Sequence, residues 1–217
     1  MVIELIEKQF IELSSLFPSL EINNDKTVIT GSLSFEIECY IDSFDIEITI
    51  PEDYPKVLPN VQETSNRIPR NDKYHINPGG TLCLGSRRKI REIFSKEPTL
   101  LGFVTKILLP FFYSFCYLIE NGVLPYGELS HGSQGLIEDY KEFLNLNNKK
   151  EVLDFLKYML LHPFYQKTQK NFNIRTRNLC LCGSKLRFSK CHKKYNYLAD
   201  YYSKKEIEKD IEEIAKL

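Results

Sequence analysis

The spacing of apolar residues changes abruptly near residue 25, and this change restricts the fold more than any other feature of the chain. Over residues 3–17 apolar residues recur at steps of three and four, and Pro18 follows, which predicts a helix that ends there. Over residues 28–50 they alternate with a period of two, which predicts three short strands, and a fourth is expected near residues 60–64. A helix followed by such a meander predicts an α+β fold with a four-stranded antiparallel sheet flanked by helices.

Helical periodicity returns in the second half of the chain. Apolar stripes predict three further helices, over residues 99–119, 135–145 and 149–161. A closing helix is expected after Ser203, which forms a capping box with Glu206. The stretch from Ser65 to Pro98 shows no regular period, and an irregular segment of that length inside a domain is usually functional or disordered.

The segment Leu100–Ile119 resembles a membrane span, because Lys106 is its only charged residue. Pro110 and several Tyr, Ser and Thr residues interrupt it, so it is predicted to be a buried central helix rather than a membrane helix. The chain does not start with a basic region followed by a continuous apolar stretch, so no signal peptide is expected. We therefore expect a cytoplasmic protein whose six cysteines are reactive or metal-binding rather than paired.

The formal net charge is zero, but the charges are unevenly distributed. Residues 1–169 contain 17 basic and 23 acidic residues, whereas residues 170–199 contain eight basic residues and no acidic one. A globally basic nucleic-acid binder is therefore disfavoured, although a local basic patch is not. The change in charge predicts two domains, residues 1–165 and a small basic module of residues 166–217.

Four potential metal ligands lie within 13 residues of this module: Cys180, Cys182, Cys191 and His192. Three thiolates and one imidazole complete a tetrahedral shell for zinc and leave no position for water, which favours a structural zinc site over unligated or oxidised cysteines. The spacing resembles the SEC-C motif, a short zinc-binding module found at the ends of many bacterial proteins. In that family the module is associated with protein–protein or ribosome-related contacts. The resemblance leaves open whether the basic face binds protein or nucleic acid, and protein is the leading expectation.

Of the other three cysteines, Cys39 lies on a predicted strand and Cys116 on the apolar helix, so both are expected in the core. Cys83 lies in the long irregular stretch, with Arg87-Arg88-Lys89 close behind it. Cations near a thiol stabilise the thiolate and raise its reactivity. Cys83 is therefore the candidate nucleophile, with an inert loop cysteine as the alternative.

The order of these features resembles the ubiquitin-conjugating enzymes. A helix and a strand meander are followed by Tyr54-Pro55 and Pro59, which resemble that family's Tyr-Pro-x-x-Pro-Pro turn. A His-x-Asn stretch and the sequence Gly-Thr-Leu-Cys-Leu follow, so the family's cysteine corresponds to Cys83, and its His and Asn to His75 and Asn77. The resemblance covers roughly residues 1–120 and implies the ubiquitin-conjugating (UBC) fold.

The resemblance implies roles for these residues. Cys83 would hold the C-terminus of a ubiquitin-like protein as a thioester and pass it to an amine. His75 would organise the loop, and Asn77 would support the oxyanion formed during acyl transfer. Ile76 replaces the family's proline, the spacer to the cysteine is about two residues shorter than usual, and no tryptophan follows the cysteine.

The segment 127–135, which contains His131, is similar to the bacterial branch of this class, including members found in cyclic-oligonucleotide antiphage (CBASS) operons. In those systems the conjugated protein is a cyclic-nucleotide synthase rather than ubiquitin. The chain has no Gly-rich nucleotide loop, so the acyl group must arrive activated, from an adenylating partner or as an already reactive protein C-terminus.

Several alternatives stay open at this stage. His75 and Asn77 are equally well explained as loop-forming residues, and His131 either lies on a surface loop or lines the Cys83 cleft. The basic run from Arg87 to Arg91 is either a solvated charge cluster or a docking surface for an acidic partner. A non-catalytic binding scaffold similar to RWD domains is the second functional hypothesis. A cysteine peptidase is the third, although no papain-like or caspase-like sequence surrounds Cys83.

Overall fold

The computed structural model describes residues 2–127, 129–160, 185–191 and 198–217, which form two compact units. Unit 1 comprises residues 1–85 and 93–128, and unit 2 comprises residues 86–92 and 129–217. The predicted domain boundary after residue 165 lies outside the described residues and stays a prediction.

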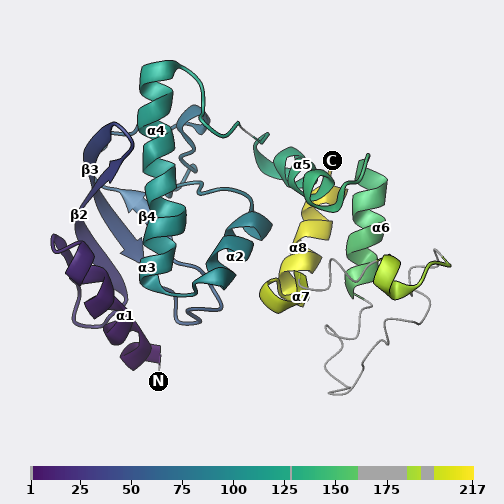
Figure 1. The fold of residues 1–217 in the computed structure, drawn as a ribbon, viewed down its shortest axis with the longest axis horizontal. Coiled ribbons are helices and arrows are strands. Elements are labelled where there is room, and N and C mark those ends of the chain that lie inside the picture. The colour runs from purple at the N-terminus through teal and green to yellow at the C-terminus, as the bar shows by residue number, and fades with distance from the viewer. Residues whose placement is uncertain (1, 128, 161–184, 192–197) are drawn as a thin grey trace. The chain divides into compact units, whose positions relative to one another are not determined.

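Unit 1 combines one antiparallel sheet with helices (Figure 1). Its elements in chain order are α1 (Val2–Leu16), β1 (Leu20–Ile22), β2 (Val28–Ile37), β3 (Tyr40–Thr49), β4 (Asn60–Glu63), the 3₁₀ turn η1 (Asp72–Tyr74), α3 (Leu100–Phe103), the π-helical turn η2 (Val104–Leu108) and α4 (Leu109–Asn121). The sheet has the order β1-β2-β3-β4, and each strand pairs with the next in antiparallel fashion. The prediction of an α+β fold with a four-stranded antiparallel meander is confirmed.

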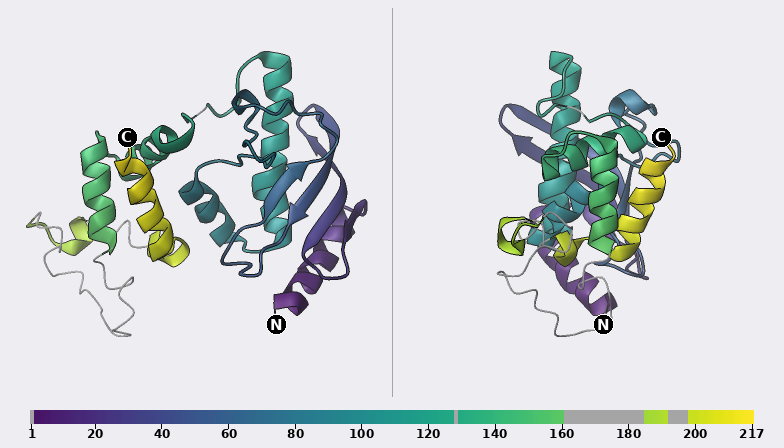
Figure 2. Two further views of the ribbon diagram at one scale, coloured as in Figure 1. Left: turned by 180° about the vertical axis from the view of Figure 1, so that it is seen from behind. Right: turned by 90° about the vertical axis from the view of Figure 1, so that its right-hand side faces the viewer.

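The two faces of the sheet differ as the period-two pattern predicts. On β3, Phe44, Ile46 and Ile48 are buried, whereas the residues between them are exposed or half-buried. The helical run from α3 to α4 lies across the buried face, as the two opposite views agree (Figures 1 and 2). Phe44 and Phe112 stack with ring centroids 4.3 Å apart and their planes 11° apart, which joins β3 to α4.

The predicted strand that carries Cys39 is wrong. Instead, β2 and β3 form one long hairpin, paired from Val28↔Thr49 to Ile37↔Tyr40, and Glu38 and Cys39 are its two-residue turn. Glu38 adopts a positive φ of 54°. Such turns usually contain Asn-Gly or Asp-Gly, and Glu-Cys is neither. The alternation of apolar and polar residues therefore runs through the turn without a turn signal. Cys39 is therefore exposed, not part of the core, whereas Cys116 is buried as predicted.

The long apolar helix contains a π-helical turn directly before Pro110. Proline cannot donate an N–H, and its ring would clash with the carbonyl four residues earlier in a regular helix. The helix forms a wider, π-helical turn there, in which the Leu109 N–H donates to the Val104 carbonyl, five residues back. A proline placed in the middle of the apolar run is thus accommodated without breaking the helix.

Among the described residues, the run Leu100–Asn121 is long and apolar enough to span a membrane, with a mean hydropathy of 1.6 over a window that is 50% buried in the structure. Core helices of soluble proteins meet the same criteria of length and hydropathy. The packing of Phe112 and Cys116 in unit 1 accords with the predicted buried central helix. The cytoplasmic location stays a prediction.

Unit 2 is helical in the part that the structure describes. Its elements are α5 (Gly132–Leu144), α6 (Lys149–Leu160), the 3₁₀ turn η3 (Phe188–Lys190), α7 (Leu198–Tyr201) and α8 (Lys204–Ala215). The helix α2 (Arg87–Lys96) begins in unit 2 and ends in unit 1. The predicted capping box is confirmed: the Ser203 hydroxyl accepts from the Glu206 N–H, and the Glu206 carboxylate accepts from the Ser203 N–H. On α8, Ile207 and Ile214 are fully buried, whereas Leu217, which follows the helix, is exposed.

The core of unit 2 contains a buried carboxylate, Asp210 on α8, with no exposed surface. It accepts hydrogen bonds from the hydroxyls of Tyr140 and Tyr202 and from the guanidinium of Arg87 at 3.0 Å. A second buried pair joins Arg88 to both oxygens of Asp139, at 2.7 and 2.8 Å. Buried charges of this kind must be paired and hydrogen-bonded, because an isolated one loses its hydration without compensation.

Candidate functional site

The candidate nucleophile closes a short hairpin formed by residues 75–83. The Cys83 N–H donates to the His75 carbonyl at 2.7 Å, and Ile76 pairs with Leu82 in an antiparallel bridge. At the tip, the Gly80 N–H donates to the Asn77 carbonyl at 2.8 Å, so Asn77 to Gly80 form a β-turn. Pro78 occupies its second position and Gly80, with a positive φ of 82°, its fourth, where a type I turn favours proline and glycine. The structure therefore brings His75 and Cys83 together through the backbone.

This hairpin is attached to the sheet of unit 1. The Leu82 N–H donates to the Val61 carbonyl at 2.8 Å, and Thr81 forms a bridge with Gln62 on β4. Ile76 and Leu82 are both buried. The irregular stretch of the sequence is thus an ordered extension of the sheet that fixes the backbone of Cys83.

The Cys83 side chain is half-buried. Burial raises the pKa of its thiol above the ordinary value, a hydrogen bond from the Gly85 backbone lowers it, and the negative charge of Asp72 raises it further. The expectation that neighbouring cations stabilise the thiolate is therefore not met in this structure.

The reason lies in the partners of the basic run. Arg87 pairs with Asp210 and Glu213, Arg88 with Asp139 and Glu92, and Arg91 with Glu206, at 2.7 to 2.9 Å. All these residues belong to unit 2. The run is neither a solvated cluster nor a free docking surface over these three arginines: it forms structural ion pairs. The sequence analysis also missed α2, although Ile90, Ile93 and Phe94 have the i, i+3, i+4 spacing of a helix.

The side chain of Asn77 is exposed, and its amide donates to the Thr81 hydroxyl at 3.0 Å. This bond stabilises the tip of the hairpin, which matches the loop-forming alternative. Oxyanion support by Asn77 stays a prediction, and it would use the second N–H of the amide, since the bond to Thr81 engages one.

His75 follows η1 in the left-handed conformation, with φ 56° and ψ 42°. With Tyr74 it lines a small hollow of about 30 Å³ against α4, where Phe115 and Leu118 lie, together with Leu124. The Tyr74 and Phe115 rings meet edge to face, 5.8 Å apart. His75 is thus held between the hairpin and α4, the position of a residue that organises the loop.

His131 belongs to unit 2, where it precedes α5 as an exposed N-cap residue. The turn around it is held by Glu138, which accepts hydrogen bonds from the backbone and hydroxyl of Ser130, both at 2.8 Å. Hydrogen bonding, first from the Ser130 backbone, lowers the pKa of Glu138. A role of His131 beside Cys83 stays a prediction.

Three of the four predicted zinc ligands, Cys180, Cys182 and His192, lie outside the described residues. Cys191 is half-buried and packs against the apolar core of unit 2. No group of three or more potential metal ligands occurs within residues 2–127, 129–160, 185–191 and 198–217. The zinc site stays a prediction that depends on the chemistry of its four donors.

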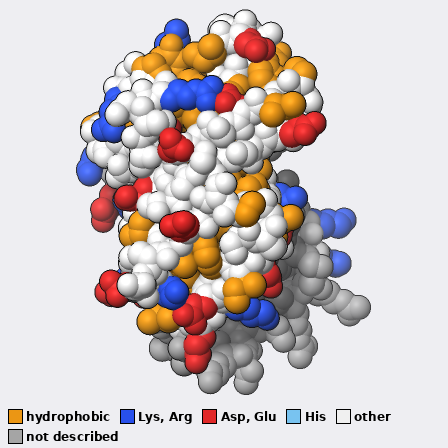
Figure 3. Space-filling view, turned by 90° about the vertical axis from the view of Figure 1, so that its left-hand side faces the viewer, with side chains coloured by type: hydrophobic (Ala, Val, Ile, Leu, Met, Phe, Trp, Pro, Cys, Tyr) orange, Lys and Arg blue, Asp and Glu red, His pale blue; other side chains and the backbone are white. Residues whose placement is uncertain are grey.

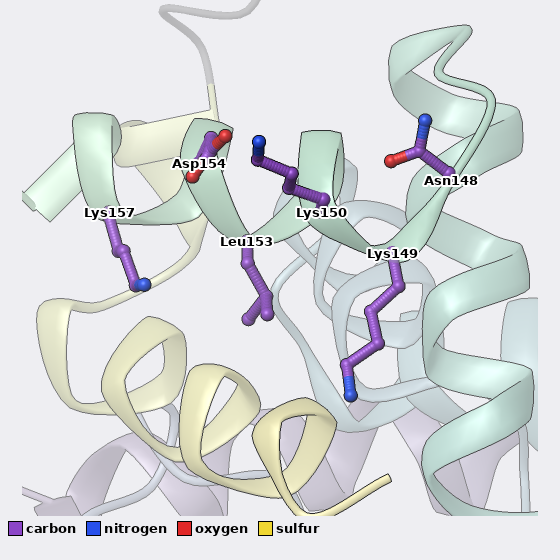
Figure 4. A pocket seen from close by; sticks show the side chains of 6 residues that line it. All are labelled: Asn148, Lys149, Lys150, Leu153, Asp154 and Lys157. Carbon is purple, nitrogen blue, oxygen red and sulfur yellow. The ribbon is translucent and has the colours of Figure 1, made fainter.

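A shallow hollow of about 510 Å³ lies along α6, and Figure 4 shows the side chains that line it. They are Asn148, Lys149, Lys150, Leu153, Asp154 and Lys157. None of the predicted site residues lines it, and it contains neither a thiol nor an imidazole. The candidate nucleophile Cys83 therefore does not lie in this hollow.

No protein-family model matches the chain, and no curated protein sequence matches it.

Proposed function

We propose that the chain is a ubiquitin-conjugating-like cysteine transferase with the UBC fold. The observation that carries the proposal is the Cys83 hairpin: a half-buried thiol at a fixed backbone position, following a four-stranded antiparallel meander. The resemblance of the surrounding sequence to that family, from Tyr54-Pro55 to Leu84, supports the same conclusion.

The proposed reaction has two steps. In the first, the Cys83 thiol loses its proton and its sulfur attacks the activated C-terminal carbonyl of a partner protein, and the previous carrier of the acyl group leaves. In the second, an amine attacks the resulting thioester, an amide bond forms, and the sulfur leaves and regains a proton. Such covalent catalysis divides one difficult condensation into two easier exchanges.

The raised pKa of Cys83 is compatible with this chemistry. A thiol with an elevated pKa is mostly protonated at neutral pH, so it resists indiscriminate oxidation and alkylation. It reacts faster when a partner is bound and its proton can be removed. A thioester exchange between two bound proteins provides that situation, because proximity replaces intrinsic reactivity.

The proposal extends to the partners and to the metal. The conjugated partner is a ubiquitin-like protein or the C-terminus of a cyclic-nucleotide synthase, supplied by an adenylating enzyme, in bacterial antiphage defence in the cytoplasm. Cys180, Cys182, Cys191 and His192 bind one structural zinc ion, which would hold their segment together and take no part in the reaction.

Co-expression with the proteins encoded next to this chain tests the proposal. Non-reducing electrophoresis should show an adduct that a thiol reductant removes and that is absent from Cys83→Ala. Cys39→Ser is the matched control, because Cys39 is exposed in the β2–β3 turn and should be dispensable. If no thiol-sensitive adduct forms and Cys83→Ala behaves like the wild type, the transferase proposal fails.

A non-catalytic binding scaffold is the second candidate. It is favoured by the Asn77 amide, which is engaged with Thr81 rather than directed at a reacting group, and by the elevated pKa of Cys83. Full activity of a Cys83→Ser chain in cells would support this candidate over the transferase.

A further inference from the structure

Four tyrosines gather where the β2–β3 hairpin meets the C-terminal end of α4 in unit 1. Tyr113 is buried, and its ring centroid lies 5.4 Å from Tyr40, 6.1 Å from Tyr117 and 6.2 Å from Tyr126. Tyr40 and Tyr117 also contact each other, with centroids 6.3 Å apart. We call Tyr40, Tyr113, Tyr117 and Tyr126, with the adjacent Glu38 and Glu120, the tyrosine patch.

Carboxylates lie directly beside these rings. Glu38 accepts a hydrogen bond from the Tyr113 hydroxyl at 2.7 Å, and this bond is the main reason that the pKa of Tyr113 is raised. Burial raises the pKa of Tyr40, and a hydrogen bond with Glu120 raises it further. Asn121 also donates to the Tyr40 hydroxyl at 3.1 Å. Each carboxylate therefore raises the pKa of one tyrosine of the patch.

The chain segments that build the patch contain no positive charge. Within unit 1, residues 27–55 and 107–127 contain eight Asp or Glu residues and no Lys or Arg. The chain as a whole has a formal net charge of zero, so this acidity is a local property. On the face drawn in Figure 3, hydrophobic side chains lie among both acidic and basic ones.

The patch is open to solvent on one side. Tyr126 is 77% exposed and Val123, in the same loop, 60% exposed. Ile41 is equally exposed at 78%, but it points to the opposite face of the sheet from Tyr40, because successive strand residues alternate. The exposed ring of Tyr126, next to the buried ring of Tyr113 and with carboxylates at the edge, therefore offers a surface on which a ligand can bind.

We propose that the tyrosine patch binds a lysine- or arginine-bearing segment of a partner protein. The faces of tyrosine rings attract cations, and Arg and Lys bind to them with the charged group above the ring. Glu38 and Glu120 complement the same positive charge, and Val123 contacts the aliphatic stem of such a side chain. The charge and the aromatic surface therefore select a basic peptide over an acidic or a purely apolar partner.

This surface does not depend on the chemistry proposed for Cys83, because none of its residues belongs to the Cys83 hairpin. The two proposals can therefore fail separately. Binding to the tyrosine patch should persist in Cys83→Ser, whereas loss of the patch should leave the thiol of Cys83 intact.

The test uses the full chain and a fluorescent twelve-residue peptide of alternating lysine and glycine, titrated by fluorescence anisotropy at low salt. We expect saturable binding, and no binding of the matched peptide with glutamate in place of lysine. Tyr126→Ala should raise Kd by about two- to fivefold, as expected for the loss of one exposed cation–π contact. Tyr126→Phe should bind like the wild type, because the ring and not the hydroxyl makes the contact.

Charge variants separate the patch from general electrostatic attraction. Glu120→Gln should raise Kd by about two- to threefold at low salt and reduce the salt dependence. Glu36→Gln also removes one negative charge, but on β2 and on the face of the sheet opposite to Tyr40, so it should bind like the wild type. The proposal is overturned if Tyr126→Ala leaves Kd unchanged, if Glu36→Gln weakens binding as much as Glu120→Gln, or if the glutamate peptide binds equally well.

Discussion

Different interactions stabilise the interiors of the two units. Unit 1 is built mainly from apolar side chains between a sheet and a long helix, and its polar interior is limited to groups such as Gln9 and Glu63. Unit 2 has an apolar core of comparable kind but adds buried ion pairs, in which Asp210 pairs with Arg87 and Asp139 with Arg88. An apolar interior follows from the period of the sequence, whereas a buried ion pair depends on a partner that is distant in the chain. The sequence therefore predicts an apolar interior of the kind in unit 1, but not the buried ion pairs of unit 2.

The largest expected effect concerns the metal predicted for unit 2. Cys182→Ser should remove most of the bound zinc, because a closed tetrahedral site depends on all four ligands. Structural zinc sites contribute on the order of 10 kcal/mol to the folding of small modules. Metal analysis of protein purified without chelator should find about one zinc ion per wild-type chain.

Cys39→Ser provides the matched control for this measurement, since it removes a thiol that lies in unit 1. The control should retain the metal. An absence of zinc from the wild-type chain would contradict the assignment of the four ligands.

The next largest effect is expected on the stability of unit 2, from a variant that breaks its buried network. Asp210→Asn keeps the shape of the side chain but leaves Arg87 without its buried counter-charge and disturbs the bonds from Tyr140 and Tyr202. Removing one partner of a buried pair typically costs about 3–5 kcal/mol of unfolding free energy. Urea unfolding monitored by circular dichroism measures this loss.

Glu208→Gln on the same helix is the control. Glu208 forms an exposed pair with Lys204 at 3.5 Å, and pairs of this kind contribute at most about 1 kcal/mol. If Asp210→Asn costs no more than Glu208→Gln, the buried network does not stabilise unit 2 and the comparison between the units is wrong.

The corresponding polar contact in unit 1 should matter less. The hydroxyl of the buried Tyr54 donates to the Gln9 side-chain oxygen at 2.6 Å, and the same oxygen accepts from the Leu100 N–H at 3.0 Å. In Tyr54→Phe the Gln9 oxygen keeps one donor, so the loss should be about 1 kcal/mol. Thermal unfolding checks the value, with the exposed Tyr126→Phe as the control that should have no effect.

The smallest effect concerns the pKa of Cys83. Asp72 disfavours the thiolate, so Asp72→Asn should lower the pKa of Cys83 and move the pH profile of its alkylation to lower pH. At pH 7.5 the rate of modification by iodoacetamide should rise roughly twofold. Mass spectrometry of the peptide that contains Cys83 measures the rate, and Asp25→Asn, in the turn before β2, is the control.

The same profile tests the cause of the main shift. Because burial raises the pKa of Cys83, the wild-type midpoint should lie above the ordinary range of a cysteine thiol. A midpoint well below that range would show that a cation stabilises the thiolate after all.

The sequence was informative where one interaction dominates locally. Periodicity predicted α1, the sheet and the long helix, and the Ser203–Glu206 capping box was confirmed atom by atom. The Glu38-Cys39 turn was missed because strand alternation continues through it and neither residue has a strong turn preference. β1 was missed because it has only three residues, Leu20–Ile22.

The candidate site was predicted in part. The sequence placed Cys83 in the one long stretch without a period, and the structure brings His75 to it through the backbone. It could not show that Arg87 and Arg88 pair with carboxylates 123 and 51 residues away, because nothing local marks those partners. For the same reason it overestimated their effect on Cys83, whose pKa is shifted by burial, the Gly85 backbone and Asp72.

The central claim is that Cys83 carries an acyl group, and an intact-mass measurement tests it most directly. The chain purified after co-expression with its genomic neighbours should show an added mass equal to that of the partner less one water, and a thiol reductant should remove it. In Cys83→Ser the same added mass should resist the reductant, because an oxygen ester replaces the thioester. An unmodified wild-type chain, or an added mass that persists in Cys83→Ala, would contradict the account.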